Sequence, residues 1–173
     1  MRLFYALTFT PESRKAISLC QDQLTKVAKR NHLVDADNFH ITLEFVGEVC
    51  QESLDRYIKV IEQLTLEQSD VEVTGLGAFG RGGEKLIWLA IKPHPWLMKL
   101  QSSLKDELIK LGFKPETRQY IPHITLARHT KLQCELSEIA ITPQRLKLYS
   151  IALLESCRQG TSVKYITRKQ KLL

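Results

Sequence analysis

The chain has 173 residues, of which 43% are apolar and 25% charged, and a chain of this size and composition can bury one substantial core. No apolar run approaches the roughly 20 residues that cross a bilayer, and the first residues lack the length and cleavage site of a signal peptide. We therefore expect one compact domain over residues 1–173, located in the cytoplasm and without a membrane partner. The formal net charge of +6 favours a polyanionic partner, because cationic side chains attract phosphates and release their counterions.

The first half of the chain predicts alternating strands and helices. Residues 2–8 are rich in aromatic and β-preferring types, which indicates a strand. Thr10 and Pro11 then provide a helix N-cap and a first-turn proline, and apolar residues at three- and four-residue steps predict a helix to about Arg30. The following elements are expected to be a strand over residues 39–46 ended by Gly47, a helix over residues 51–66 and a strand beginning at Val71.

The next segment contains five glycines between residues 75 and 83. They predict a turn-rich loop rather than a phosphate-binding P-loop, which would need Gly-Lys-Ser/Thr at the start of a helix. Further along, strands are predicted over residues 85–92, 123–128, 145–154 and 163–168, with a helix over residues 96–111 closed by Gly112 and a turn at Gln159-Gly160. Helices and strands alternate without a regular βαβ period, which predicts an α+β protein of two similar lobes.

Cysteine usage argues against a zinc site. The four cysteines are far apart, with no Cys-x-x-Cys pair and no histidine at zinc-finger spacing. We expect all four to be reduced thiols, as is usual in the cytoplasm.

One tetrapeptide occurs twice in the chain. His40-Ile41-Thr42-Leu43 recurs letter for letter as His123-Ile124-Thr125-Leu126, each time in a strand-like segment. Side chains alternate between the two faces of a strand, so His40 and Thr42 should project on one side and the apolar pair on the other. The same holds for His123 and Thr125. Each copy therefore presents an imidazole and a hydroxyl together.

Two such strands meeting at one cleft would supply what is needed to cleave a phosphodiester without a metal. Histidine titrates near neutral pH, so one imidazole can take a proton from water while the other donates one to the leaving oxygen. The hydroxyls of Thr42 and Thr125 can donate hydrogen bonds to phosphate oxygens. Arg128, five residues after His123, adds a candidate guanidinium for the same oxygens. Because the motifs are identical, the sequence leaves open which histidine is the acid and which the base.

The remaining histidines and aromatic residues are assigned smaller roles. We expect His32 at the end of a helix, His94 in a turn between two prolines and His129 at a strand end. Phe45 and Tyr120 are candidates for stacking on a base, although aromatic residues beside strands more often belong to the core.

At these residues the sequence resembles the 2H phosphoesterase superfamily, whose signature is two His-x-Thr/Ser-x motifs, and in particular the RNA 2',3'-cyclic phosphodiesterase (2'-5' RNA ligase) family. The similarity spans nearly the whole chain. It includes the opening strand Arg2-Leu3-Phe4-Tyr5-Ala6-Leu7, the stretch from Asn38 to Val49, the hairpin from Ala78 to Trp88 and the stretch Pro122-His123-Ile124-Thr125-Leu126-Ala127-Arg128.

The resemblance implies two pseudo-symmetric lobes, with antiparallel sheets lining a basic central cleft and helices outside. It implies hydrolysis of RNA ends or nucleotides with a 2',3'-cyclic phosphate to a 2'-phosphomonoester, without metal or other cofactor. His40 and His123 would be acid and base, Thr42 and Thr125 phosphate ligands and Arg128 a phosphate contact. We expect a monomer with no obligate protein partner.

Two alternatives remain open from the sequence alone. The same site could act on a 2'-5' linkage, by ligation or cleavage, or on another small nucleotide substrate. The protein could also be a non-catalytic module that binds RNA ends.

Overall fold

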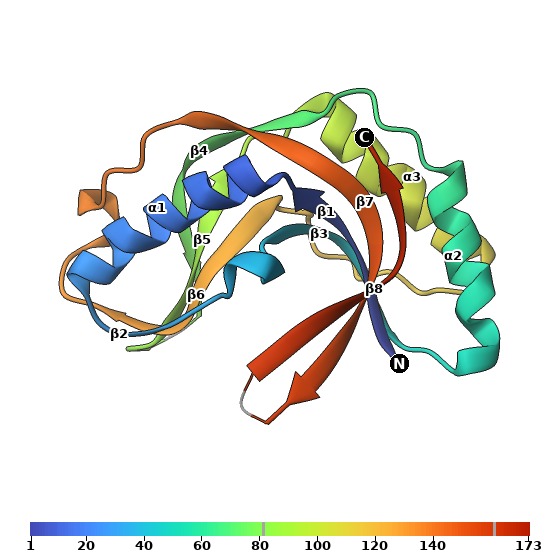
Figure 1. Ribbon diagram of the computed structural model, residues 1–173, viewed down its shortest axis with the longest axis horizontal. Coiled ribbons are helices and arrows are strands. Elements are labelled where there is room, and N and C mark those ends of the chain that lie inside the picture. The colour runs from blue at the N-terminus through green and yellow to red at the C-terminus, as the bar shows by residue number, and fades with distance from the viewer. Residues whose placement is uncertain (81, 161) are drawn as a thin grey trace.

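The computed structural model describes residues 1–80, 82–160 and 162–173 (Figure 1). Its strands are β1 Arg2–Phe9, β2 Ala28–Leu33, β3 His40–Glu48, β4 Asp70–Phe79, β5 Lys85–Ile91, β6 His123–Leu132, β7 Gln144–Gln159 and β8 Ser162–Leu172. Its α-helices are α1 Pro11–Val27, α2 Leu54–Gln63 and α3 Pro95–Lys110, and short 3-10 turns cover η1 Ala36–Asn38, η2 Gln51–Ser53 and η3 Leu136–Glu138. None of the helices in these described ranges is long and apolar enough to cross a membrane.

The strands pair antiparallel in the order β1-β3-β6-β5-β4-β7-β8, with β2 added on β6. Because β1 also pairs with β7, the first six strands of this order close into a ring. The link between β3 and β6 is a single residue pair, Ile41 opposite Ile124. The hairpin formed by β7 and β8 extends beyond the rest of the sheet, as Figure 1 shows in red. The two strands that carry the repeated motif thus meet at one point.

Each long helix packs on a motif strand from the other half of the chain. Helix α1 follows β1 but contacts β6 and β7, whereas α3 follows β5 but contacts β3. The start of α1 forms as the sequence predicts, because the Thr10 hydroxyl accepts a hydrogen bond from the Ser13 backbone N–H at 3.3 Å and Pro11 occupies the first turn. This crossed arrangement brings side chains of α1 and α3 to the backs of the two motif strands.

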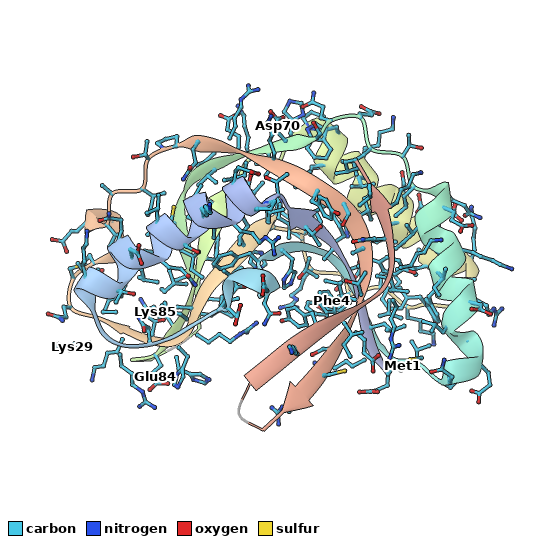
Figure 2. The ribbon with its side chains drawn as sticks, viewed as in Figure 1. Met1, Phe4, Lys29, Asp70, Glu84 and Lys85 are labelled. Carbon is cyan, nitrogen blue, oxygen red and sulfur yellow. The ribbon has the colours of Figure 1, made fainter. Side chains whose placement is uncertain are left out.

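Strand β1 is buried on both faces. Leu3, Tyr5 and Leu7 belong to the main core under the helices, whereas Phe4 and Ala6 form a second apolar cluster on the opposite face. Phe4, labelled in Figure 2, pairs with Leu154 near the base of the β7–β8 hairpin. Burial of each large apolar side chain contributes roughly 1.5–3 kcal/mol to the stability of the fold. Strand β1 therefore stabilises the protein through contacts on both of its faces.

The predicted α+β class is confirmed, with helices outside an antiparallel sheet. The first helix, predicted to about Arg30, ends at Val27, because Ala28 takes up extended backbone angles and residues 28–33 form β2. Strand β2 pairs with β6, so hydrogen bonding to a distant strand overrides the local helical pattern. The prediction for His32 is therefore wrong: it lies in β2, opposite Arg128, and not at a helix end.

The glycine-rich segment is also more regular than predicted. Gly75 and Gly77 lie inside β4, and Trp88 of β5 is the cross-strand partner of Gly77. A Cβ atom on Gly77 would meet the indole ring at about 2.2 Å, so glycine lets that ring lie flat across β4. The turn is confined to residues 80–84, of which Arg81 lies outside the described residues.

Several other helix and strand ends differ from the predicted ones by a few residues. The helix predicted over residues 51–66 divides into η2 and the shorter α2, which ends at Gln63. The strands predicted over residues 123–128, 145–154 and 163–168 extend to Leu132, Gln159 and Leu172. Each of these strands continues because a neighbouring strand pairs with the added residues.

Candidate functional site

His40 and His123 are the first residues of β3 and β6. Their strands touch at the Ile41–Ile124 pair, which directly follows both histidines. Ile41 and Ile124 are fully buried, while the two histidines are only partly buried, so the predicted alternation holds at both motifs. The fold therefore brings the two copies of the motif together from opposite halves of the chain.

Both imidazoles are anchored in the same way. Nδ1 of His40 lies 2.6 Å from the backbone oxygen of Asn38, and Nδ1 of His123 lies 2.7 Å from that of Ile121. A carbonyl oxygen only accepts, so each Nδ1 carries a proton and donates it. The neutral ring then has its lone pair on Nε2, which is the nitrogen available for proton transfer.

The two threonines differ in their contacts. Nε2 of His40 lies 3.1 Å from the Thr42 hydroxyl, which can donate to the imidazole lone pair. Thr125 lies opposite Trp88 in the β5–β6 ladder, and no His123–Thr125 hydrogen bond occurs among the described residues. Tyr120 contacts the backbone of the first motif, because its hydroxyl donates a hydrogen bond to the Thr42 carbonyl oxygen at 3.0 Å.

A β-bulge follows each threonine at the same place. In β3, Thr42 and Glu44 oppose consecutive residues of β1, so Leu43 is the extra residue. In β6, Thr125 and Ala127 oppose consecutive residues of β5, so Leu126 is the extra residue. Each extra residue resets the alternation of side chains along its strand.

The bulge at Leu126 determines the face of β6 on which Arg128 lies. Without a bulge, a residue five positions after His123 would lie on the opposite face of the strand from His123. The extra residue at Leu126 shifts the alternation by one, so Arg128 lies on the same face as His123. The charge of Arg128 lowers the pKa of both His40 and His123. Among the described residues no acidic side chain forms an ion pair with Arg128, and Glu84 pairs with Arg30 and His129. Its guanidinium therefore remains available to an anion.

The two imidazoles differ in their degree of desolvation. Burial, the largest cause, together with the charges of His123 and Arg128 lowers the pKa of His40 to about 4. The pKa of His123 is also lowered, first by burial and then by Arg128. Both rings are thus held toward the neutral form in the free protein, and His40 the more strongly.

Each imidazole packs against two aromatic rings that also contact each other. Phe4 and Tyr165 contact His40, with ring centroids 5.2 and 5.1 Å away. On the other side, Phe79 and Trp88 contact His123 at 5.2 and 5.5 Å. These packed rings fix the orientation of both imidazoles and account for part of their desolvation.

A pocket of about 320 Å³ opens beside the two motifs, and both Thr42 and His123 line it. Of the two candidate stacking residues, Phe45 lines this pocket with 58% of its surface exposed. Tyr120 also lines the pocket, but its hydroxyl is used by the Thr42 carbonyl. Phe45 is therefore the more accessible of the two aromatic rings.

The remaining histidines lie outside this pocket. His94 is the N-cap residue of α3, as expected for a turn before the helix. His32 and His129 contact each other at a ring distance of 5.6 Å, and His129 Nδ1 lies 3.2 Å from Glu84. Among the described residues no group of three or more His, Cys, Asp or Glu side chains is placed to hold a metal ion.

Several site residues are not indicated by the sequence pattern. Phe4 and Tyr165 reach His40 from the first and last strands, and only the folded topology brings them there. Glu44 and Gln101 line the pocket from β3 and α3. The position of Glu44 directly after the first motif could have marked it as a candidate site residue. Side-chain alternation alone does not predict which face of β3 it occupies, because a bulge intervenes.

Comparison with known proteins gives a consistent result. The family model described as "2'-5' RNA ligase superfamily" matches residues 11–157. A protein of Archaeoglobus fulgidus named RNA 2',3'-cyclic phosphodiesterase is 30% identical over 140 residues, which cover 80% of this chain and 78% of that protein. A Thermotoga maritima protein of the same name is 30% identical over 168 residues, with 88% of each chain covered.

Solved structures agree on the fold. A Thermus thermophilus protein matches all of this chain and 98% of its own, with a TM-score of 0.80 and 22% identity. Escherichia coli LigT in complex with 3'-AMP covers 99% of this chain and 97% of its own, with a TM-score of 0.75 and 24% identity.

Proposed function

Because this chain belongs to the 2'-5' RNA ligase superfamily, we propose that it hydrolyses RNA ends carrying a 2',3'-cyclic phosphate to 2'-phosphomonoesters. The observation that carries the proposal is the identical anchoring of two imidazoles on adjoining strands, each with its Nε2 left for proton transfer. The names of the Archaeoglobus and Thermotoga relatives support the choice of substrate.

The proposal gives the two imidazoles different proton roles, and their unequal pKa shifts support the choice. His40, with a pKa of about 4, is neutral at physiological pH and acts as the base. It takes a proton from water while the water oxygen bonds to phosphorus. The bond from phosphorus to the ribose 3' oxygen breaks, and His123 gives its Nε2 proton to that oxygen. An anionic phosphate in the cleft raises the pKa of His123 and so favours its protonated form.

The polar residues around the phosphate stabilise the five-coordinate transition state. Thr42 and Thr125 donate hydrogen bonds to the non-bridging oxygens, and Arg128 supplies a fixed positive charge. In the free protein the Thr42 hydroxyl interacts with His40 Nε2. Binding of phosphate draws this hydroxyl away and leaves the lone pair for the attacking water.

Turnover of a short RNA ending in a 2',3'-cyclic phosphate tests the proposal, with the product assigned by phosphorus NMR and the assay run in EDTA. A 2'-phosphate product formed in the presence of the chelator is expected. Loss of turnover with EDTA and its recovery with zinc or manganese would contradict catalysis by imidazoles alone. Binding of the RNA without turnover would favour an RNA-end-binding module, and turnover of only a 2'-5' linkage would favour the ligase reading.

The proposal also places the enzyme in the cytoplasm as a monomer. Cys20, Cys50, Cys134 and Cys157 are all free thiols, which is consistent with a reducing compartment. Size-exclusion chromatography with light scattering measures the oligomeric state directly.

A further inference from the structure

The two motif strands continue differently after their bulges. In β6 the two residues beyond the bulge are Ala127, which is fully buried, and Arg128, which acts on both histidines. The corresponding residues of β3 are Glu44 and Phe45, and both line the pocket beside the motifs. One half of the site therefore offers a cation, and the other offers a carboxylate and an aromatic ring.

The pocket has the size and position of a site for one nucleobase. Its volume of about 320 Å³ lies at the lower end of the range for ligand pockets. Thr42 and His123 form part of its wall, so a ligand whose phosphate lies between the motifs can place an attached group inside it. A base on the same ribose as the cyclic phosphate is such a group.

Phe45 provides a surface for stacking. One face packs against Phe4, with ring centroids 5.5 Å apart, and the side chain is still 58% exposed. Exposed aromatic rings beside single-stranded RNA commonly stack on bases, because every base has a π face. A ring of this kind stacks on any of the four bases and does not select among them.

Glu44 also lines the pocket and offers hydrogen-bond acceptors there. Its carboxylate is partly buried and accepts a hydrogen bond from Nε2 of Gln101 at 3.3 Å, and Gln101 itself is only 7% exposed. The pKa of Glu44 is raised, chiefly by burial, and the Lys105 cation opposes this rise. An ionised carboxylate has only acceptors, so it requires N–H groups on the base that it meets. Gln101 fixes the orientation of those acceptors.

We propose that this pocket binds the base of the terminal nucleotide, that Phe45 stacks on it, and that Glu44 selects for guanine. Guanine presents two adjacent N–H donors on one edge, which match the acceptors of one carboxylate. Uracil presents a single N–H between two carbonyl oxygens, and these oxygens are repelled by the carboxylate. The inference rests on the proposed function, because it assumes that the cyclic phosphate lies between His40 and His123.

The test uses the four mononucleoside 2',3'-cyclic phosphates, so that no upstream nucleotide contributes. The value of kcat/KM is measured for each with the wild type, Glu44→Gln, Phe45→Leu and the control Glu67→Gln. The control makes the same chemical change at an exposed carboxylate that pairs with Lys99 outside the pocket. Thermal unfolding of each variant checks that it is folded.

The wild type is expected to prefer guanosine over uridine about tenfold, as one good bidentate contact to a base edge provides. Glu44→Gln should remove most of this preference, Phe45→Leu should lower kcat/KM for all four bases about tenfold, and Glu67→Gln should change neither. Turnover with equal rates for guanosine and uridine in the wild type, or a ratio that Glu44→Gln leaves unchanged, would overturn the inference while the phosphodiesterase function stands. Failure to turn over any of the four or a cyclic-phosphate RNA would instead overturn the proposed function.

Discussion

Arg128 and Phe45 occupy equivalent positions in the two halves of the protein. Each lies five residues after a motif histidine, and in each strand a bulge at a buried leucine, Leu126 or Leu43, precedes it. The same backbone device therefore presents a guanidinium on one strand and an exposed aromatic ring on the other. Two identical tetrapeptides in this way produce a cleft whose two sides are chemically different.

The position of Arg128 predicts a shift of the pH–rate profile in Arg128→Gln. A cation beside an imidazole disfavours the imidazolium, so removal of the Arg128 charge raises the pKa of both His40 and His123. Both limbs of the bell-shaped kcat/KM profile should move to higher pH, and kcat should fall about a hundredfold because a donor to the phosphate is lost.

Arg56→Gln is the matched control, because Arg56 is exposed on α2. Its profile should coincide with that of the wild type. An unchanged profile in Arg128→Gln, or a shift to lower pH, would show that Arg128 does not act on the histidines.

The anchoring of Nδ1 predicts the tautomer of both motif histidines. At pH 7.5 His40 and His123 should be neutral, with the proton on Nδ1 and the lone pair on Nε2, because the carbonyl oxygens of Asn38 and Ile121 accept from Nδ1. Nitrogen chemical shifts of labelled protein distinguish the two tautomers. A proton on Nε2 of either ring at this pH would contradict the assigned proton-transfer atom.

The depressed pKa of His40 also predicts how stability depends on pH. The unfolded chain, with an ordinary histidine pKa of about 6.5, binds more protons than the folded protein between that pH and the folded pKa of about 4. The contribution of His40 to stability is therefore complete above pH 6.5 and is lost as pH falls toward 4. His40→Asn should show a weaker decline of the unfolding free energy over this interval, measured by urea denaturation. An equal decline in both proteins would contradict the burial of a neutral imidazole.

Gly77→Ala tests the packing behind His123. The added Cβ would lie about 2.2 Å from the Trp88 ring, so the indole must move, and it is one of the two rings that contact His123. We expect a loss of about 1–3 kcal/mol of stability together with lower kcat. Gly83→Ala is the control, because nothing lies within 4 Å of a Cβ atom at that position. Equal effects of the two substitutions would show that the close packing on Gly77 is unimportant.

Sequence reasoning predicted the features that depend on short-range geometry. The face shared by each histidine and its threonine follows from an alternation that holds over three residues. The bulge after each threonine and the β2 strand depend on pairing with distant strands. Neither feature can therefore be predicted from the neighbouring residues in the sequence. Phe4 and Tyr165 reach His40 for the same reason, since only the closed sheet brings the two ends of the chain to the first motif.

The most direct test of paired histidine catalysis is a double-mutant cycle on single-turnover rates, with His40→Ala, His123→Ala and the double variant acting on a cyclic-phosphate RNA. If the two imidazoles serve one proton-transfer reaction, each single variant should lose several orders of magnitude, and the double variant should lose little more than the worse single one. A single variant that keeps a rate close to that of the wild type would contradict the central claim that both histidines carry the reaction.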